Sequence, residues 1–187
     1  MSTMPASFDT GEPSKWPKVV GILSIVWSVL GVTCGGCGLA SGAMTEWAAS
    51  MAPPEFGPMP AELKPTGLQL GLAGAGMFWA LLLMASGITC VMRKPSARPL
   101  HLAYAIGAVV LALAGTYFGY MQQQVAMQFV RDNPSSKWAQ QAKPEIGLIM
   151  LVVGTALALA WPVFCLIWFG LVKRRGEGLD GGADLPA

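Results

Sequence analysis

Four long stretches without charged side chains constrain the fold of this chain more than any other feature. They cover residues 19–44, 66–92, 100–121 and 146–172, and each exceeds 20 residues. A helix needs about 20 apolar residues to cross the hydrocarbon core of a bilayer, which is roughly 30 Å thick. Backbone amides in lipid must find partners within their own segment, and no alternating pattern typical of barrel strands occurs. Each stretch is therefore predicted to form a transmembrane helix.

The composition supports this prediction. Only 12% of the 187 residues are charged, about half the roughly 25% of a soluble domain. So few charges cannot cover a water-exposed globule, whereas 53% hydrophobic residues are too many for a disordered chain. A formal net charge of +2 leaves no basic surface for nucleic acid. The lipid bilayer is therefore an expected partner, and nucleic acid is not.

We predict an all-α membrane protein with four transmembrane helices packed as two antiparallel hairpins. The transmembrane domain is expected over 18–175, between a flexible cytoplasmic N-terminal segment, 1–17, and a flexible cytoplasmic tail, 176–187. The Met- and Pro-rich loop 46–64 is expected to lack regular structure. The third helix is predicted to continue beyond its span as an amphipathic helix and to stop before Asn133-Pro134.

The basic residues predict the orientation. Eight Lys and Arg flank the spans on the side of the two termini: Lys15, Lys18, Arg93, Lys94, Arg98, Lys173, Arg174 and Arg175. Four flank them on the other side: Lys64, Arg131, Lys137 and Lys143. Because cytoplasmic loops carry the excess of Lys and Arg, both termini are predicted to be cytoplasmic.

Small residues spaced four apart are the candidate sites of helix packing. In lipid, helices associate through close backbone approach, which pairs of small residues permit. The pairs are Gly31 and Gly35, Gly38 and Gly42, Gly67 and Gly71, Gly115 and Gly119, and Gly154 and Ala158. We expect them to pack the four helices on one another. The alternative is that some face outward and bind a membrane-protein partner or a second copy of the chain.

A CxxC motif, Cys34-Gly35-Gly36-Cys37, is the candidate for catalysis. Here the sequence resembles the four-helix membrane thiol oxidases that re-oxidise periplasmic disulfide catalysts, which carry such a motif near the outer end of an early helix. The resemblance implies quinone as electron acceptor and Cys34 and Cys37 as the redox pair. The chain departs from that pattern, because 121–145 contains no second cysteine pair and no Arg follows Cys37. The alternative is that all four cysteines, Cys90 and Cys165 included, are small core residues.

No other pattern predicts a cofactor or a metal. His101, the single histidine, is expected at the membrane interface, at the start of the third helix. A zinc site needs four N or S ligands at suitable spacing, which the sequence lacks. Charged side chains within spans mark ion and proton routes, and the four spans contain none. A pump or exchanger is therefore not expected.

The layout as a whole, four apolar helices after a short lead that contains Pro17, resembles small four-helix integral membrane proteins of bacteria to which no function is assigned. The resemblance implies the bacterial cytoplasmic membrane and no particular activity. We predict a non-enzymatic accessory, assembly or structural partner. Two alternatives stay open: a thiol–quinone redox protein using Cys34 and Cys37, and a subunit of an oligomeric passive channel.

Overall fold

A computed structural model of the chain describes residues 15–172 and Leu179. The predicted flexible ends fall mainly outside the described residues, as do the three basic residues that follow the fourth span. Within 15–172 the chain is helical and contains no β-strand. The all-α prediction is therefore confirmed for the described part of the chain.

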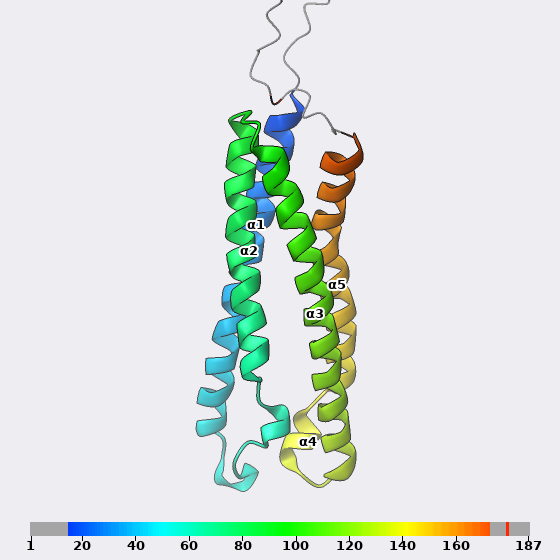
Figure 1. The fold of residues 1–187 in the computed structure, drawn as a ribbon. Helices are drawn as coiled ribbons and strands as arrows, with labels where there is room; N and C mark the ends of the chain where they lie inside the picture. Colours follow the sequence, from blue (N-terminus) through cyan, green and yellow to red (C-terminus); the bar gives the residue numbers. More distant parts are fainter. Residues whose placement is uncertain (1–14, 173–178, 180–187) are drawn as a thin grey trace, which may run out of the picture.

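Four long helices make up the fold (Figure 1). They are α1 (Trp16–Ser50), α2 (Gly67–Val91), α3 (Ala97–Asp132) and α5 (Pro144–Ile167), which is followed by a π-helical turn, η3 (Trp168–Val172). Three short elements connect them: η1 (Pro54–Phe56), η2 (Ala61–Leu63) and α4 (Lys137–Gln141). As predicted, four helices are long and apolar enough to cross a membrane.

The connections divide the molecule into two ends. The start of α1, the α2–α3 turn and η3 lie together at one end, which we call the terminal end (Figure 1). The connection between α1 and α2 and the short helix α4 lie at the other, which we call the loop end (Figure 1). An ion pair joins the two connections at the loop end, since Lys137 Nζ lies 2.5 Å from a Glu55 carboxylate oxygen.

Helix ends follow local sequence signals. α1 continues to Ser50, and η1 and η2 follow it, so the expectation that 46–64 lacks regular structure is wrong. Nothing in the sequence stops α1 before Pro53, whose ring disfavours a helical conformation in the residue preceding it. α3 ends at Asp132, directly before Asn133-Pro134, which confirms that prediction.

The start of α2 is capped by side chains. The Gln69 backbone N–H donates to Thr66 Oγ1 at 3.3 Å, and the Thr66 backbone N–H donates to Gln69 Oε1 at 2.9 Å. This reciprocal pair is a capping box, and it satisfies two backbone N–H groups that would otherwise lack a partner at the helix start. The capping box therefore fixes where the connection ends and α2 begins.

The closest helix contact lies between α1 and α2. Small residues seven apart face each other across it: Gly21, Ser28 and Gly35 on α1, and Gly87, Ala80 and Ala73 on α2. A Cβ added to Gly21 would lie 2.7 Å from the Gly87 carbonyl oxygen, and one added to Gly87 would lie 2.9 Å from the Gly21 carbonyl oxygen. The Ser28 hydroxyl donates to the Ala80 carbonyl oxygen at 2.6 Å. A repeat of seven keeps one stripe of a helix on its partner, and small residues let the backbones approach.

The contact of α1 with α5 and η3 is made by large side chains instead. It is made by rings: Trp27 stacks on Trp161 with centroids 5.8 Å apart, and Trp16 lies 6.0 Å from both Trp168 and Phe169. Large side chains hold two helices apart, just as small ones bring them together. Besides the α1–α2 contact, α3 packs on α5 and on α2. The four helices therefore form two close pairs, α1 with α2 and α3 with α5.

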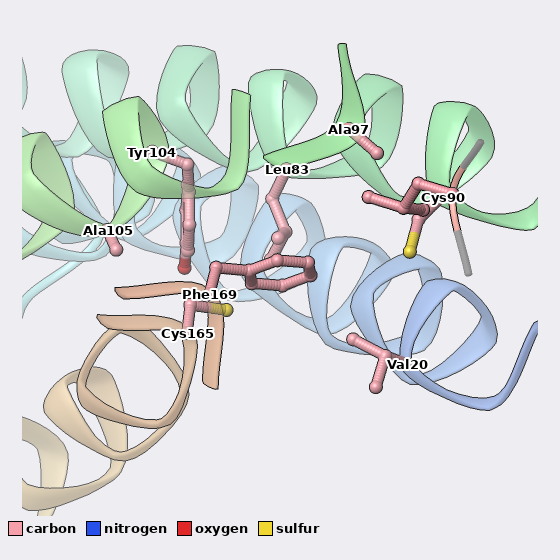
Figure 2. Packing of buried hydrophobic residues seen from close by; sticks show 9 residues of the cluster. Val20, Leu83, Cys90, Ala97, Tyr104, Ala105, Cys165 and Phe169 are labelled. Carbon is pink, nitrogen blue, oxygen red and sulfur yellow. The ribbon is translucent and has the colours of Figure 1, made fainter. Parts of the chain in front are cut away.

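The buried core lies toward the terminal end, between the two pairs. Figure 2 shows Leu83 of α2, Tyr104 of α3, Cys165 of α5 and Phe169 of η3 converging there. The outward faces, in contrast, carry large apolar side chains such as Val152, which is 68% exposed. Soluble proteins rarely expose apolar surface on this scale. The surface is compatible with a multi-pass membrane protein.

We predict that Gly87→Ala destabilises the fold and that Gly74→Ala does not. The added Cβ at Gly87 would meet the α1 backbone at 2.9 Å, whereas one at Gly74 meets nothing within 4 Å. Overpacking a close contact costs about 1–3 kcal/mol, while Ala raises helix propensity equally at both sites. The stability of both variants is measured by unfolding with sodium dodecyl sulfate in mild-detergent micelles, followed by circular dichroism. Equal stability of the two variants would contradict the close α1–α2 contact.

Candidate functional site

A groove separates the two helix pairs on the loop-end side of the aromatic rings. Its largest compartment has a volume of about 380 Å³ and is partly open. Small residues from all four long helices line it, among them Gly31, Gly76, Ala108, Gly115 and Ala158. Trp27 and Trp79 line it on the side of the terminal end, which we call the inner end of the groove. The groove exists because the rings set the distance between the pairs, and these small residues do not fill the space that results.

Two further compartments adjoin the first. One of about 330 Å³ lies toward the loop end, is lined by Ser41, Gln69 and Phe118, and shares Ala73 and Gly115 with the first. We call these two compartments the inter-pair groove. The third, of about 280 Å³, lies between α3 and α5 and also shares Gly115.

The hydroxyls between α3 and α5 are already engaged. Thr116 Oγ1 and Thr155 Oγ1 lie 2.7 Å apart, and each also lies 2.7 Å from a backbone carbonyl oxygen of its own helix. One hydroxyl donates to its carbonyl oxygen and accepts from the other hydroxyl. Hydroxyls with partners in the protein add little polarity to a surface. The third compartment therefore presents a largely apolar wall.

Trp79 fixes the floor of the groove. Its indole N–H donates to the Tyr104 backbone carbonyl oxygen at 2.9 Å, and its ring lies where a Cβ on Gly107 would be. Only glycine at 107 leaves room for the ring, which packs α2 against α3 at this point. Sequence reasoning did not select Gly107, although Ala103 and Gly107 are also small residues four apart.

His101 lies beneath this floor and is fully buried, at 0% exposure. His101 therefore lies inside the protein at the start of α3. His101 Nδ1 lies 2.8 Å from the Ala97 carbonyl oxygen, Nε2 lies 3.0 Å from Ser24 Oγ, and the ring stacks on Phe169 at 4.3 Å. Residues of α1 and η3 cover the ring there.

The hydrogen bonds of His101 determine how Ser24 is used. A carbonyl oxygen only accepts, so His101 Nδ1 carries the hydrogen shared with Ala97. In a neutral ring Nε2 is then an acceptor, and the Ser24 hydroxyl donates to it. The Val20 carbonyl oxygen, 2.9 Å from Ser24 Oγ, competes for the same hydrogen. Both polar side chains thus find partners inside the protein, and neither is left for a ligand.

The cysteines fall into two groups. Cys34 and Cys37 are free and exposed on α1. Cys90 and Cys165 are free and fully buried in the core at the terminal end, where Figure 2 shows both. The two groups lie at different levels of the bundle. The structure does not bring Cys34 or Cys37 next to Cys90 or Cys165.

The predicted packing residues occupy three environments. Six line the inter-pair groove or the adjoining hollow between α3 and α5: Gly31, Gly38, Gly115, Gly119, Gly154 and Ala158. Gly35 and Gly42 contact α2, where added Cβ atoms would lie 3.4 Å from Met77 Cβ and 3.0 Å from Leu70 Cδ2. Gly67 and Gly71 are exposed, and an added Cβ meets nothing within 4 Å at either. The contact pair Gly21 and Gly87 was missed, although its spacing of seven from Ser28 and Ala80 is visible in the sequence.

Comparisons with protein-family models, with curated proteins and with solved structures find no match for this chain. Among the described residues, no group of three or more His, Cys, Asp and Glu could hold a metal ion. Function is therefore inferred below from the chain's own residues.

We predict that His101 and Ser24 are coupled in stability. His101→Gln and Ser24→Ala each remove the contact between the His101 ring on α3 and the Ser24 hydroxyl on α1. In a double-mutant cycle they should show a coupling of about 1 kcal/mol, since one buried hydrogen bond is lost either way. The exposed Thr33 hydroxyl, which donates only to the Val29 carbonyl oxygen of its own helix, supplies the control Thr33→Ala. Unfolding by sodium dodecyl sulfate measures each variant, and strict additivity would contradict the contact.

Proposed function

We propose that this chain is a non-enzymatic integral membrane protein of the bacterial cytoplasmic membrane, and that it acts as an accessory or assembly partner of another membrane protein. In this proposal the four helices span the bilayer as two antiparallel hairpins, with both termini in the cytoplasm. The contacts of α1 with α2 and of α3 with α5 support the hairpins. The apolar outward faces support insertion, because lipid and not water is the solvent they suit.

The outward-facing pair Gly67 and Gly71 carries the partner proposal. These residues lie four apart near the start of α2, both are exposed, and no atom of the described chain covers them. In lipid, a pair of this kind lets the backbone of a second helix approach closely. Leu68, 50% exposed, lies beside the pair and adds a large apolar contact. A partner helix from another protein, or from a second copy, fits this surface.

The basic residues support the orientation. Arg93 and Lys94 lie in the α2–α3 turn at the terminal end, together with Lys15 and Lys18 at the start of α1. Lys and Arg in short loops are retained on the cytoplasmic side. The terminal end is therefore placed in the cytoplasm in this proposal.

The orientation predicts the activity of reporter fusions in bacterial cells. Alkaline phosphatase folds only outside the cytoplasm, so a fusion after Ala187 should be inactive and an insertion after Gly57 should be active. Green fluorescent protein at Ala187 should fluoresce. Active phosphatase at Ala187, with inactive phosphatase at Gly57, would reverse the orientation while leaving the four spans intact.

The partner proposal predicts a specific cross-link. A photoreactive amino acid at Leu68 should capture a discrete protein in native membranes, identified by mass spectrometry. Gly71→Leu should reduce the product at least fivefold, because the added side chain prevents close helix approach. The matched control is Gly115→Leu, another glycine at which an added Cβ meets nothing within 4 Å but which lies in the groove instead. Capture of lipid alone at Leu68, or equal capture in Gly71→Leu, would overturn the proposal.

A further inference from the structure

We propose that the inter-pair groove binds one acyl chain of a phospholipid from the leaflet at the loop end. This inference rests on the proposed insertion in the membrane, and it is independent of the partner at Gly67 and Gly71. The groove lies within the predicted spans, between helices whose outward faces suit lipid. Its occupant follows from its volume, its length and the residues at its two ends.

The volume fits an acyl chain. A cavity of about 150 Å³ holds one benzene ring, which has six carbons. By that measure the compartment of about 380 Å³ holds on the order of 15 carbons, about one acyl chain, and the two compartments of the groove together hold on the order of 30. A helix over about 20 Å would contain about 13 residues and hence about 50 backbone heavy atoms before any side chain. A partner helix is therefore too large for the groove.

Water is a poor occupant for a different reason. A buried water needs two to four polar partners, and apolar cavities stay dry. The walls of the largest compartment consist mainly of Gly, Ala, Leu and Trp side chains. The Trp79 indole N–H already donates to the Tyr104 backbone carbonyl oxygen. Tyr104 also lines the compartment, but one hydroxyl is fewer than the two to four partners that a buried water needs. An apolar chain is the occupant that these walls favour.

The length of the groove matches one leaflet. On α1 it extends from Ser41 to Trp27, which is about 21 Å at 1.5 Å per residue. Half of the hydrocarbon core is about 15 Å thick. A chain that enters at Ser41 can therefore lie in the groove along its whole length and end at the ring of Trp27.

The loop end of the groove suits a polar headgroup. Ser41 and Gln69 line this compartment, and Pro65, which follows Lys64, lies beside them. The Gln69 amide oxygen accepts from Thr66, while its NH₂ group has no hydrogen-bond partner among the described residues. The Gln69 NH₂ donor and the Lys64 cation at the loop end suit a phosphate head. The tryptophans at the inner end suit the methyl end of an apolar tail.

The test is photolabelling of the full chain in vesicles of phosphatidylethanolamine and phosphatidylglycerol. A trace of phospholipid carries a diazirine near the methyl end of one acyl chain, and mass spectrometry locates the adducts. We expect labelling at Trp27, Trp79 and Leu111 to exceed that at outward-facing Phe78 and Val152 at least threefold. Gly115→Leu should lower the groove labelling at least fivefold, because Gly115 lines all three compartments.

The control is Gly71→Leu, which should label like the unaltered chain because Gly71 lies outside the groove. Circular dichroism checks that each variant folds. Ala158→Leu, which fills the groove from α5, replaces Gly115→Leu if the latter does not fold. Outward labelling without enrichment in the groove would overturn this proposal and leave membrane insertion standing. Absence of labelling at Phe78 and Val152 as well would overturn insertion itself.

Discussion

The close approach of α1 and α2 at Gly21 and Gly87 is the contact on which the rest of the structure depends. Between helices in lipid, the hydrophobic effect supplies no driving force, because lipid tails are as apolar as leucine. What remains is dispersion, which needs many atoms at contact distance. At Gly21 and at Gly87, an added Cβ would lie within 3 Å of the other glycine's carbonyl oxygen, which leaves no room for any side chain. Small residues seven apart carry this contact along α1 and α2, so the pair behaves as one rigid unit.

The second pair is placed against this unit by rings, and that difference in size produces the groove. Trp27 on Trp161, and Trp16 on Trp168, hold α1 away from α5 and η3. Toward the loop end the rings stop, and the positions between the pairs are occupied by residues such as Gly38 and Gly115. The two helix pairs therefore stay apart toward the loop end, where no large side chain fills the space between them. The inter-pair groove is thus a geometric consequence of which positions carry large side chains.

Much of the fold could be predicted from single residues and short runs. The four helices long and apolar enough to cross a membrane follow from the absence of charge, and the end of α3 at Asp132 follows from Asn133-Pro134. Partners across helices could not be predicted in this way. Spacing by four marks Gly31, Gly67 and Gly115 alike, yet one lies near Ala80, one faces outward and one lines a groove. A small residue only permits close approach, and the neighbouring helix decides whether approach occurs. The burial of His101 could not be predicted for the same reason, since it depends on α1 and η3 covering the ring.

The polar groups of the core support this emphasis on shape. Ser24, Ser28, Ser86 and His101 are each fully buried, and each has a hydrogen-bond partner in the described chain. A polar group whose bonds are all made within the protein stabilises the fold and offers nothing to a ligand. Specificity in such a chain must come from where backbone and small side chains leave space. Two places that do so are the outward face at Gly71 and the groove at Gly115, and these two glycines lie on different helices. One substitution can therefore fill either space and leave the other open.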